Sequence, residues 1–371
     1  MRVILFCHSL RSDWNHGNAH FLRGVCVELQ RRGHDVVAYE PADAWSAAQL
    51  ARAEGTEALE TYRSQYPTLH PRVYRAESLD LEDALDAADL VLVHEWNTPD
   101  LVRRIGRVRS RGAGFRLLFH DTHHRSSSST EEIGSLDLSG FDGVLAFGDA
   151  IRERYDRHGW SRRTWTWHEA ADISVFYPRS GPRDAGELVW IGNWGDEERS
   201  AELATYLLEP ARALGLSGHV YGVRYPPAAI EAVSRSGLAY AGRVANQSVP
   251  PVFASHRVTV HVPRQPYAAS ILGVPTIRVF EALACGIPLV SAPWHDTEGL
   301  FVEGRDFLMA RSGAEMQRHL RDVVSDGNYA DALARHGRRT IIKRHTCAHR
   351  VDELLAIAQE LGARTVREEV V

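Results

Sequence analysis

The chain has 371 residues, which is enough for two domains of ordinary size. Its hydrophobic content of 44% and charged content of 25% are typical of a soluble globular protein. The formal net charge of -5 at pH 7 argues against a dedicated nucleic-acid surface.

The first part of the chain has the pattern of a parallel β–α–β unit. The apolar run at residues 3–7 predicts a buried strand, residues 19–32 predict a helix, and residues 36–39 predict the next strand. The polar loop before the helix contains Gly17 and Asn18. Gly17 could face a ligand, or it could only supply a positive φ angle in a plain strand-to-helix turn.

Residues 89–94 predict another buried strand, and Glu95 and Trp96 follow it directly. Ligands of open parallel sheets bind beyond the carboxyl ends of the strands, so these two residues are candidate acceptor contacts. A capped turn before the helix that begins near Pro99 would explain them equally well.

The strand predicted at residues 115–119 ends in the run His120-Asp121-Thr122-His123-His124. Asp121 could orient an acceptor group or act as a base. A metal site is the competing interpretation, because the run is rich in side chains that bind metals. Successive residues at a strand end point to different sides, however, and we therefore expect no metal here.

The second half of the chain begins with a strand predicted at residues 188–191 and a glycine turn. A helix is expected from about residue 197, with Arg199 early in it. A glycine turn that opens a β–α unit beside an arginine can hold a phosphate, although Arg199 could instead be a solvated helix residue. The strand predicted at residues 258–262 ends close to Arg264, which is a plausible phosphate or sugar ligand.

The most informative stretch runs from Thr276 into a strand that starts at Leu289. Its apolar spacing predicts a short helix, which Gly286 ends as a left-handed cap. Arg278 and Glu281 then share one helix face, and the helix N-terminus offers N–H groups to an anion. A carboxylate one turn further in can accept hydrogen bonds from sugar hydroxyls. This combination predicts a nucleotide-sugar site.

The pattern R-x-F-E-A-L-A-C-G-x-P-L-V that starts at Arg278 resembles the group-1 glycosyltransferases of GT-B fold, in particular their CgeB-like, spore-maturation-type branch. The resemblance implies an α/β protein with two Rossmann-like domains whose parallel sheets face a central cleft. Residues 1–175 would form the acceptor domain and residues 176–345 the nucleotide-sugar donor domain. Residues 346–371 would form a helix that returns to the N-terminal domain.

The resemblance also implies roles for individual residues. His120 matches a strand-end histidine that faces the donor sugar, and Arg243 matches the region that contacts the nucleobase. The implied catalytic residues are His120, Asp121 and Glu281. The implied donor-binding residues are Gly17, Gly192, Asn193, Arg199, Arg243, Arg264, Thr276, Arg278 and Glu281. The implied acceptor-side residues are Asn18, Glu95, Trp96, His123 and Glu169.

The implied activity is transfer of a sugar from a nucleoside-diphosphate sugar to an acceptor hydroxyl, with retention and without a metal or other cofactor. Retaining relatives often carry two glutamates eight positions apart, and Gly273 stands where the first would be. One alternative is a sugar-nucleotide epimerase or hydrolase on the same scaffold. The other is a non-catalytic sugar-nucleotide-binding protein, to which the missing glutamate gives some weight.

Cysteine spacing and hydropathy bear on the compartment. The four cysteines form no CxxC pair, which favours reduced thiols over disulfides or zinc. No apolar run reaches the roughly 20 residues of a membrane span, and residues 3–7 are too short for a signal peptide. We expect a cytoplasmic protein with at most peripheral membrane contact. Its acceptor would be a carbohydrate, a lipid-linked molecule or a small molecule, and not a nucleic acid.

Overall fold

The computed structural model describes residues 1–195 and 198–363. The chain divides into two compact units. The first unit contains residues 1–169 and the residues from Cys347 onward, and the second unit contains residues 170–346. The sequence placed the division slightly later, after residue 175.

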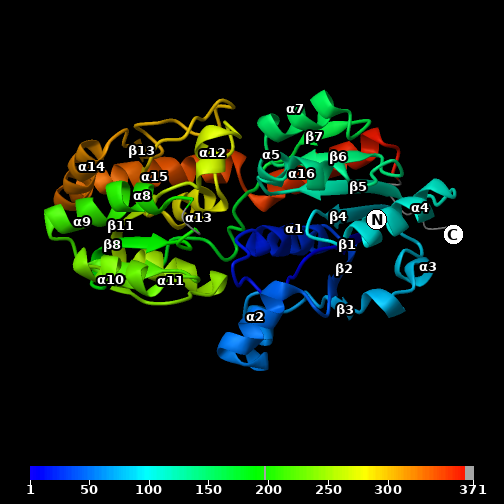
Figure 1. The fold of residues 1–371 in the computed structure, drawn as a ribbon, viewed down its shortest axis with the longest axis horizontal. Helices are drawn as coiled ribbons and strands as arrows, with labels where there is room; N and C mark the ends of the chain where they lie inside the picture. The colour runs from blue at the N-terminus through cyan, green and yellow to red at the C-terminus, as the bar shows by residue number, and fades with distance from the viewer. Residues whose placement is uncertain (196–197, 364–371) are drawn as a thin grey trace. The chain divides into compact units, whose positions relative to one another are not determined.

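A seven-stranded parallel sheet forms the centre of the first unit, in the order β3-β2-β1-β4-β5-β6-β7 (Figure 1). The strands are β1 (Arg2–Phe6), β2 (Asp35–Pro41), β3 (Arg72–Tyr74), β4 (Leu90–His94), β5 (Arg116–Asp121), β6 (Gly143–Ala146) and β7 (Thr164–Thr166). Val3 of β1 is aligned with Val36 of β2 and with Leu90 of β4. The strand order reverses between β1 and β4, and this switch point is where open sheets of this kind bind ligands.

The helices of the first unit follow the strands. They are α1 (Ala19–Arg31), α2 (Trp45–Glu54), η1 (Thr56–Ser64), η2 (Ala76–Ser78), α3 (Leu81–Ala84), α4 (Pro99–Ser110), α5 (Arg125–Ser128), α6 (Thr130–Gly134), α7 (Asp149–His158) and α16 (Cys347–Glu360). The last helix, α16, packs beside α1, where Arg32 donates to the carboxylate of Asp352 and to the carbonyl oxygen of Ala348. The predicted return of the final helix to the N-terminal domain is confirmed. The tail from residue 364 lies outside the described residues.

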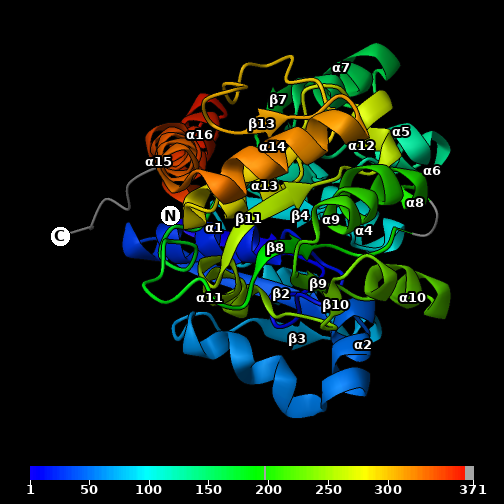
Figure 2. The same cartoon turned by 90° about the vertical axis from the view of Figure 1, so that its left-hand side faces the viewer.

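The second unit contains a six-stranded parallel sheet in the order β10-β9-β8-β11-β12-β13. The strands are β8 (Gly186–Ile191), β9 (Gly218–Tyr221), β10 (Ala239–Tyr240), β11 (His256–His261), β12 (Leu289–Ser291) and β13 (Leu308–Met309). The helices are α8 (Ser200–Leu203), η3 (Ala204–Leu208), α9 (Glu209–Leu214), α10 (Pro227–Arg235), η4 (Asn246–Ser248), α11 (Val249–Ala254), α12 (Gln265–Ala269), α13 (Ile277–Cys285), α14 (Gly313–Ser325) and α15 (Gly327–Arg344). Helices cover both faces of this sheet (Figure 2). The core buries Leu188, Val258 and Leu320 completely.

The predicted helix after Thr276 is confirmed as α13, and Gly286 ends it with a φ of 67°, the left-handed cap that the sequence predicted. The strand that follows is β12. The helix expected from residue 197 has its predicted start outside the described residues, and α8 begins at Ser200. In the described part of the chain, no helix combines the length and apolar character needed to cross a bilayer.

Candidate functional sites

Three arginines of the second unit gather near the N-terminus of α13. Arg199, Arg264 and Arg278 come from segments that are distant in the sequence. Burial, together with the positive charges of Arg264 and Arg278, lowers the pKa of Arg199 to about 10. Like charges that are buried together destabilise each other, so a bound anion would stabilise this group. We call these three residues the arginine cluster.

Hydrogen bonds fix Arg199 across the turn that follows β8. Its guanidinium donates to the carbonyl oxygen of Val262 at 2.9 Å and to that of Asn193, and it lies over the ring of Trp190. Arg264 donates to the partly exposed carboxylate of Glu198 at 3.1 Å and is less buried than Arg199. The predicted phosphate side of the site is thus assembled from three chain segments.

The glycine turn after β8 depends on Gly192. A Cβ atom at this position would lie 2.7 Å from the ring of Trp190, so a larger residue does not fit without a shift. The side chain of the next residue, Asn193, accepts a hydrogen bond from the N–H of Val223 at 2.9 Å and joins the turn to the loop after β9. Arg243 is partly buried in the segment after β10.

His261, at the end of β11, holds the residue that precedes α13. The hydroxyl of Ser291 donates to the carbonyl oxygen of Ala292, so it accepts from His261 Nδ1 at 2.8 Å. Burial, together with the charges of two arginines of the cluster, lowers the pKa of His261 to about 3. Nε2 of the neutral ring is therefore an acceptor, and the hydroxyl of Thr276 donates a hydrogen bond to it at 3.0 Å. Thr276 cannot donate that proton to a ligand as well.

Glu281 is fully buried on α13 and forms an ion pair with Arg278, one turn earlier. The glutamate that relatives carry eight positions before it is replaced by Gly273, which has a φ of 91°. A Cβ atom at Gly273 would lie 2.4 Å from Oγ1 of Thr297. The backbone at this position therefore requires glycine, and no glutamate fits the same conformation.

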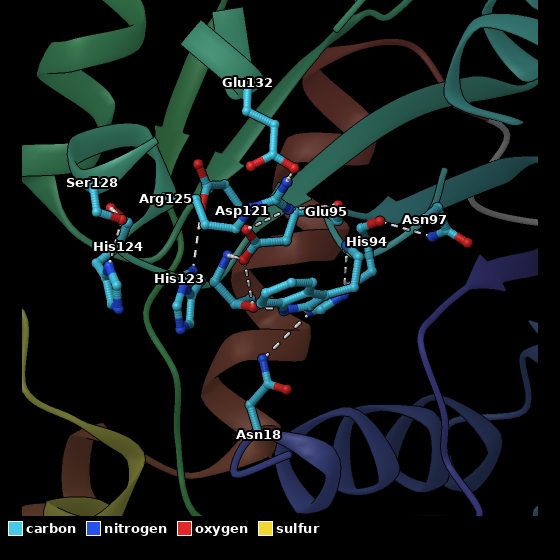
Figure 3. Close-up of polar contacts among 12 residues, drawn as sticks. Asn18, His94, Glu95, Asn97, Asp121, His123, His124, Arg125, Ser128 and Glu132 are labelled. Carbon is cyan, nitrogen blue, oxygen red and sulfur yellow. Dashed lines mark hydrogen bonds and ion pairs between the residues drawn. The ribbon is translucent and has the colours of Figure 1, made fainter. Parts of the chain in front are cut away.

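In the first unit, a chain of hydrogen bonds connects the ends of β4 and β5 (Figure 3). The N–H of Trp96 points to Nδ1 of His94 at 3.4 Å. Nε2 lies 2.9 Å from the hydroxyl of Thr122, which donates to Glu95 at 3.2 Å. The side-chain amide of Asn18 also lies 3.4 Å from His94 Nε2. Thr122 thus links Glu95 to the ring of His94.

Two buried carboxylates, Glu95 and Asp121, lie next to this chain of hydrogen bonds, and the positive charge of Arg125 acts on both. Arg125 lies 3.6 Å from Glu95 and also pairs with Glu132. Burial, and then the charge of Asp121, raises the pKa of Glu95, and burial raises the pKa of Asp121 to about 6. Asp121 accepts from the hydroxyl of Tyr155 at 2.9 Å. These contacts keep the side chains of Glu95 and Asp121 buried within the first unit.

The structure places His120 and Asp121 beneath the surface. The His120 ring lies 4.7 Å from the ring of Trp167 and lines a small internal cavity with apolar side chains of β1, β4 and α1. Burial lowers the pKa of His120 to about 3. Asp121 has no exposed surface and also accepts from the N–H of His123 at 3.2 Å. Both side chains are therefore buried, and the catalytic roles that the resemblance implied for them stay predictions.

The other acceptor-side residues differ in their surroundings. Trp96 and His123 lie together, with ring centroids 5.3 Å apart, at the carboxyl ends of β4 and β5. Glu169 is buried, and its carbonyl oxygen accepts from Arg350 of α16 at 3.5 Å. In the loop before α1, Asn15 has a positive φ of 48°, whereas Gly17 does not have a positive φ. The plain-turn interpretation, in which Gly17 supplied a positive φ, is therefore wrong.

Sequence reasoning missed His94, Arg125 and Tyr155 in the first unit and His261 in the second. His261 had a usable signal, because it is a polar residue at the end of the strand predicted at residues 258–262, three positions before Arg264. Within residues 1–195 and 198–363, no group of three or more His, Cys, Asp or Glu side chains is arranged to hold a metal ion.

Comparison with known proteins places this geometry in a family context. Residues 199–356, which cover most of the second unit and part of α16, match a family model described as glycosyl transferase-like. The Anabaena protein HepE, solved with UDP and glucose, superposes with a TM-score of 0.68 at 16% identity, over 98% of this chain and 100% of that chain. The chain has the GT-B glycosyltransferase fold. The GT-B fold predicted from the α13 segment is confirmed, and the family-model match includes that segment.

Two further GT-B structures match along nearly their whole length. Sucrose-phosphate synthase from Thermosynechococcus elongatus has a TM-score of 0.64 at 14% identity, over 98% of this chain and 100% of that chain. An α-glucosyltransferase solved with UDP and a 13-mer DNA has a TM-score of 0.69 at 12% identity, over 97% of this chain and 99% of that chain. No curated protein sequence matches this GT-B chain significantly.

Proposed function

We propose that this protein is a glycosyltransferase that moves a sugar from a nucleoside-diphosphate sugar to an acceptor hydroxyl. The observation that carries the proposal is the arginine cluster at the N-terminus of α13, inside the segment that matches the glycosyl transferase-like family. HepE and the α-glucosyltransferase were solved with UDP, so a UDP-sugar is the first donor to test.

The diphosphate binds the arginine cluster and the N–H groups in the first turn of α13. Because the hydroxyl of Thr276 already donates its hydrogen bond to His261, the hydrogen bonds to phosphate come from backbone N–H groups and guanidiniums. Glu281 accepts hydrogen bonds from the ribose hydroxyls. Arg278, which pairs with Glu281 when no ligand is bound, can bridge the ribose and phosphate parts of the ligand.

Catalysis follows from where negative charge develops. When the glycosidic bond breaks, the diphosphate leaves with an additional negative charge, and fixed guanidiniums and amide dipoles stabilise that charge more than the charge of the bound donor. The three guanidiniums supply the positive charge that a divalent cation supplies in other phosphate sites, so we propose a metal-independent reaction. Retention of the anomeric configuration is proposed from the sequence resemblance and is tested by NMR of the product.

A thermal-shift panel of UDP, GDP, CDP and dTDP tests the donor site, because a ligand that binds the folded state raises its stability. We expect UDP to give the largest shift, and the Arg278→Met variant to lose most of it. Arg318→Met is a matched control, because Arg318 is an exposed arginine that pairs with Glu315 on α14. Equal shifts for Arg278→Met and the wild type would contradict the proposed donor site.

A product assay separates transfer from the alternative reactions. With a UDP-sugar labelled in the sugar, transfer requires an acceptor and gives a labelled glycoside. Free labelled sugar would instead identify a hydrolase, and an isomerised nucleotide sugar an epimerase. Gly273 favours a non-catalytic binding protein as the second candidate, which predicts UDP-sugar binding without any product.

A further inference from the structure

Three tryptophans of the first unit gather beyond the carboxyl ends of its strands. Trp45, the first residue of α2, is 37% exposed, and its ring centroid lies 6.2 Å from that of Trp14 and 6.5 Å from that of Trp96. The His8 ring packs against Trp45 at 4.8 Å, and Trp96 contacts His123 at 5.3 Å. We call these five residues the tryptophan face.

The tryptophan face lies at the sheet's switch point. Its residues follow β1, open α2, and follow β4 and β5, so strands on both sides of the reversal contribute to it. Tryptophan buries a large apolar area in most folds, and a partly exposed group of three is unusual on a surface without a binding role.

The polar groups next to the face have unused hydrogen-bonding capacity. His16 is 5% exposed, its ring lies 5.3 Å from that of His8, and its Nε2 has no hydrogen-bond partner in the described structure. The side-chain oxygen of Asn18, which is 8% exposed, is likewise without a partner. Buried polar atoms of this kind are costly until a ligand or water reaches them.

These groups are uncharged at neutral pH. Burial lowers the pKa of His8 to about 4 and places the pKa of His16 well below its ordinary value. The carboxylate that faces His8, Asp43, opposes this effect on His8 without cancelling it. Neutral imidazoles and amides hydrogen-bond to hydroxyls but provide no net charge for an anion.

The arginines around the face are already paired with carboxylates. Arg11 donates to Glu40, Arg23 lies 3.5 Å from Asp13, and Arg125 pairs with Glu95 and Glu132. Arg125 also lies over the ring of Trp96, 4.7 Å from its centroid. A phosphate at this face would have to break one of these ion pairs.

We propose that the tryptophan face binds a neutral saccharide, which is the acceptor of the transfer reaction. The C–H faces of a sugar ring pack on the indoles, and the hydroxyls at its rim bond to His16, Asn18 and His123. The proposal rests on the glycosyltransferase function above and narrows its acceptor to unphosphorylated sugars. It disfavours sugar phosphates and lipid phosphates.

Saturation-transfer NMR and tryptophan fluorescence on the full chain test this proposal directly. The ligands are neutral gluco-oligosaccharides and galacto-oligosaccharides, the same sugars with a phosphate, and a planar aromatic glycoside. We expect the neutral oligosaccharides to bind best and Trp45→Ala to weaken them about tenfold, as expected for a central aromatic contact. Trp45→Phe should recover part of the loss. Trp160→Phe, at a half-buried tryptophan stacked on His158, is the matched control and should change nothing.

UDP titration of each variant separates this proposal from the proposed function. Trp45→Ala should bind UDP as the wild type does, which also shows that the variant folds. Tighter binding of a phosphorylated sugar or of the planar glycoside would overturn the proposal. Unchanged saccharide affinity in Trp45→Ala, or no saccharide binding by a wild type that binds UDP, would overturn it as well. If the wild type binds saccharide through Trp45 but binds no nucleotide, the proposed function fails and the saccharide site stands.

Discussion

Replacing Arg199 with methionine tests the electrostatic argument for the donor site. Burial and the neighbouring charges lower the pKa of Arg199 from 12.5 to about 10. This difference corresponds to about 3 kcal/mol by which the ligand-free site disfavours the charged form. The negative charge of a bound diphosphate offsets this penalty, which arises mainly from burial, so Arg199 can contribute up to about 3 kcal/mol to the binding of UDP. We therefore expect Arg199→Met to weaken UDP binding by roughly 100-fold.

The same substitution has two opposing effects on the stability of the ligand-free protein. It removes the hydrogen bonds to the carbonyl oxygens of Val262 and Asn193, each worth about 1.5–3 kcal/mol when the donor is charged. It also removes the penalty for burying the charge, which is about 3 kcal/mol, so stability should fall by no more than about 3 kcal/mol.

Isothermal titration with UDP and urea unfolding of the ligand-free protein measure the two quantities. Arg235→Met is the control, because Arg235 forms an exposed ion pair with Glu231 on α10 and should affect neither one. UDP binding by Arg199→Met that equals binding by the control would refute the electrostatic reasoning.

Three other substitutions have defined outcomes. Gly273→Ala places a Cβ atom 2.4 Å from Thr297 at a φ of 91°, and urea unfolding should show a loss of about 2–4 kcal/mol; an unchanged midpoint would be inconsistent with the close approach. In the folded state Asp121 keeps its proton up to about pH 6, whereas the unfolded chain releases it near pH 4. The free energy of unfolding therefore falls as the pH rises between these values, by at most about 3 kcal/mol. Asp121→Asn should lack this loss in urea unfolding from pH 4 to 7, and parallel pH profiles would argue against it. His261→Ala removes the hydrogen bond that holds Thr276, so the N-terminus of α13 is misplaced and UDP affinity should fall about tenfold. A UDP titration that shows no change would exclude His261 from the site.

The sequence predicted the parts of this structure that depend on local pattern. The helix α13, its glycine cap at Gly286 and the strand β12 follow from apolar spacing and from backbone conformations that only glycine adopts easily. The GT-B fold followed from the same segment, because a helix with Arg278 and Glu281 on one face is characteristic of the family.

Side-chain direction and long-range packing could not be predicted in the same way. His120 and Trp96 both lie at strand ends, but the His120 ring packs against Trp167, while Trp96 joins the tryptophan face. The alternation of a strand does not show which face of the sheet is covered, and residues at the irregular strand end follow no period. Trp45 lies far from Trp96 in the sequence, so only the fold brings them together.

The missing family glutamate shows how structure completes a sequence observation. From the sequence, Gly273 was the absence of an expected carboxylate. The structure shows a backbone with a positive φ, where an added Cβ atom would lie 2.4 Å from Oγ1 of Thr297, and this position therefore favours glycine. A glutamate here would need a different backbone conformation, so the departure from the family pattern is more than the loss of a side chain.

Hydrogen–deuterium exchange of the full chain, with and without saturating UDP, tests the central claim most directly. The account predicts increased protection in the peptides that contain Asn193, Arg264 and Thr276, because these peptides include or adjoin the arginine cluster. Bound UDP that protects other peptides and leaves these three unchanged would contradict the assignment of the donor site.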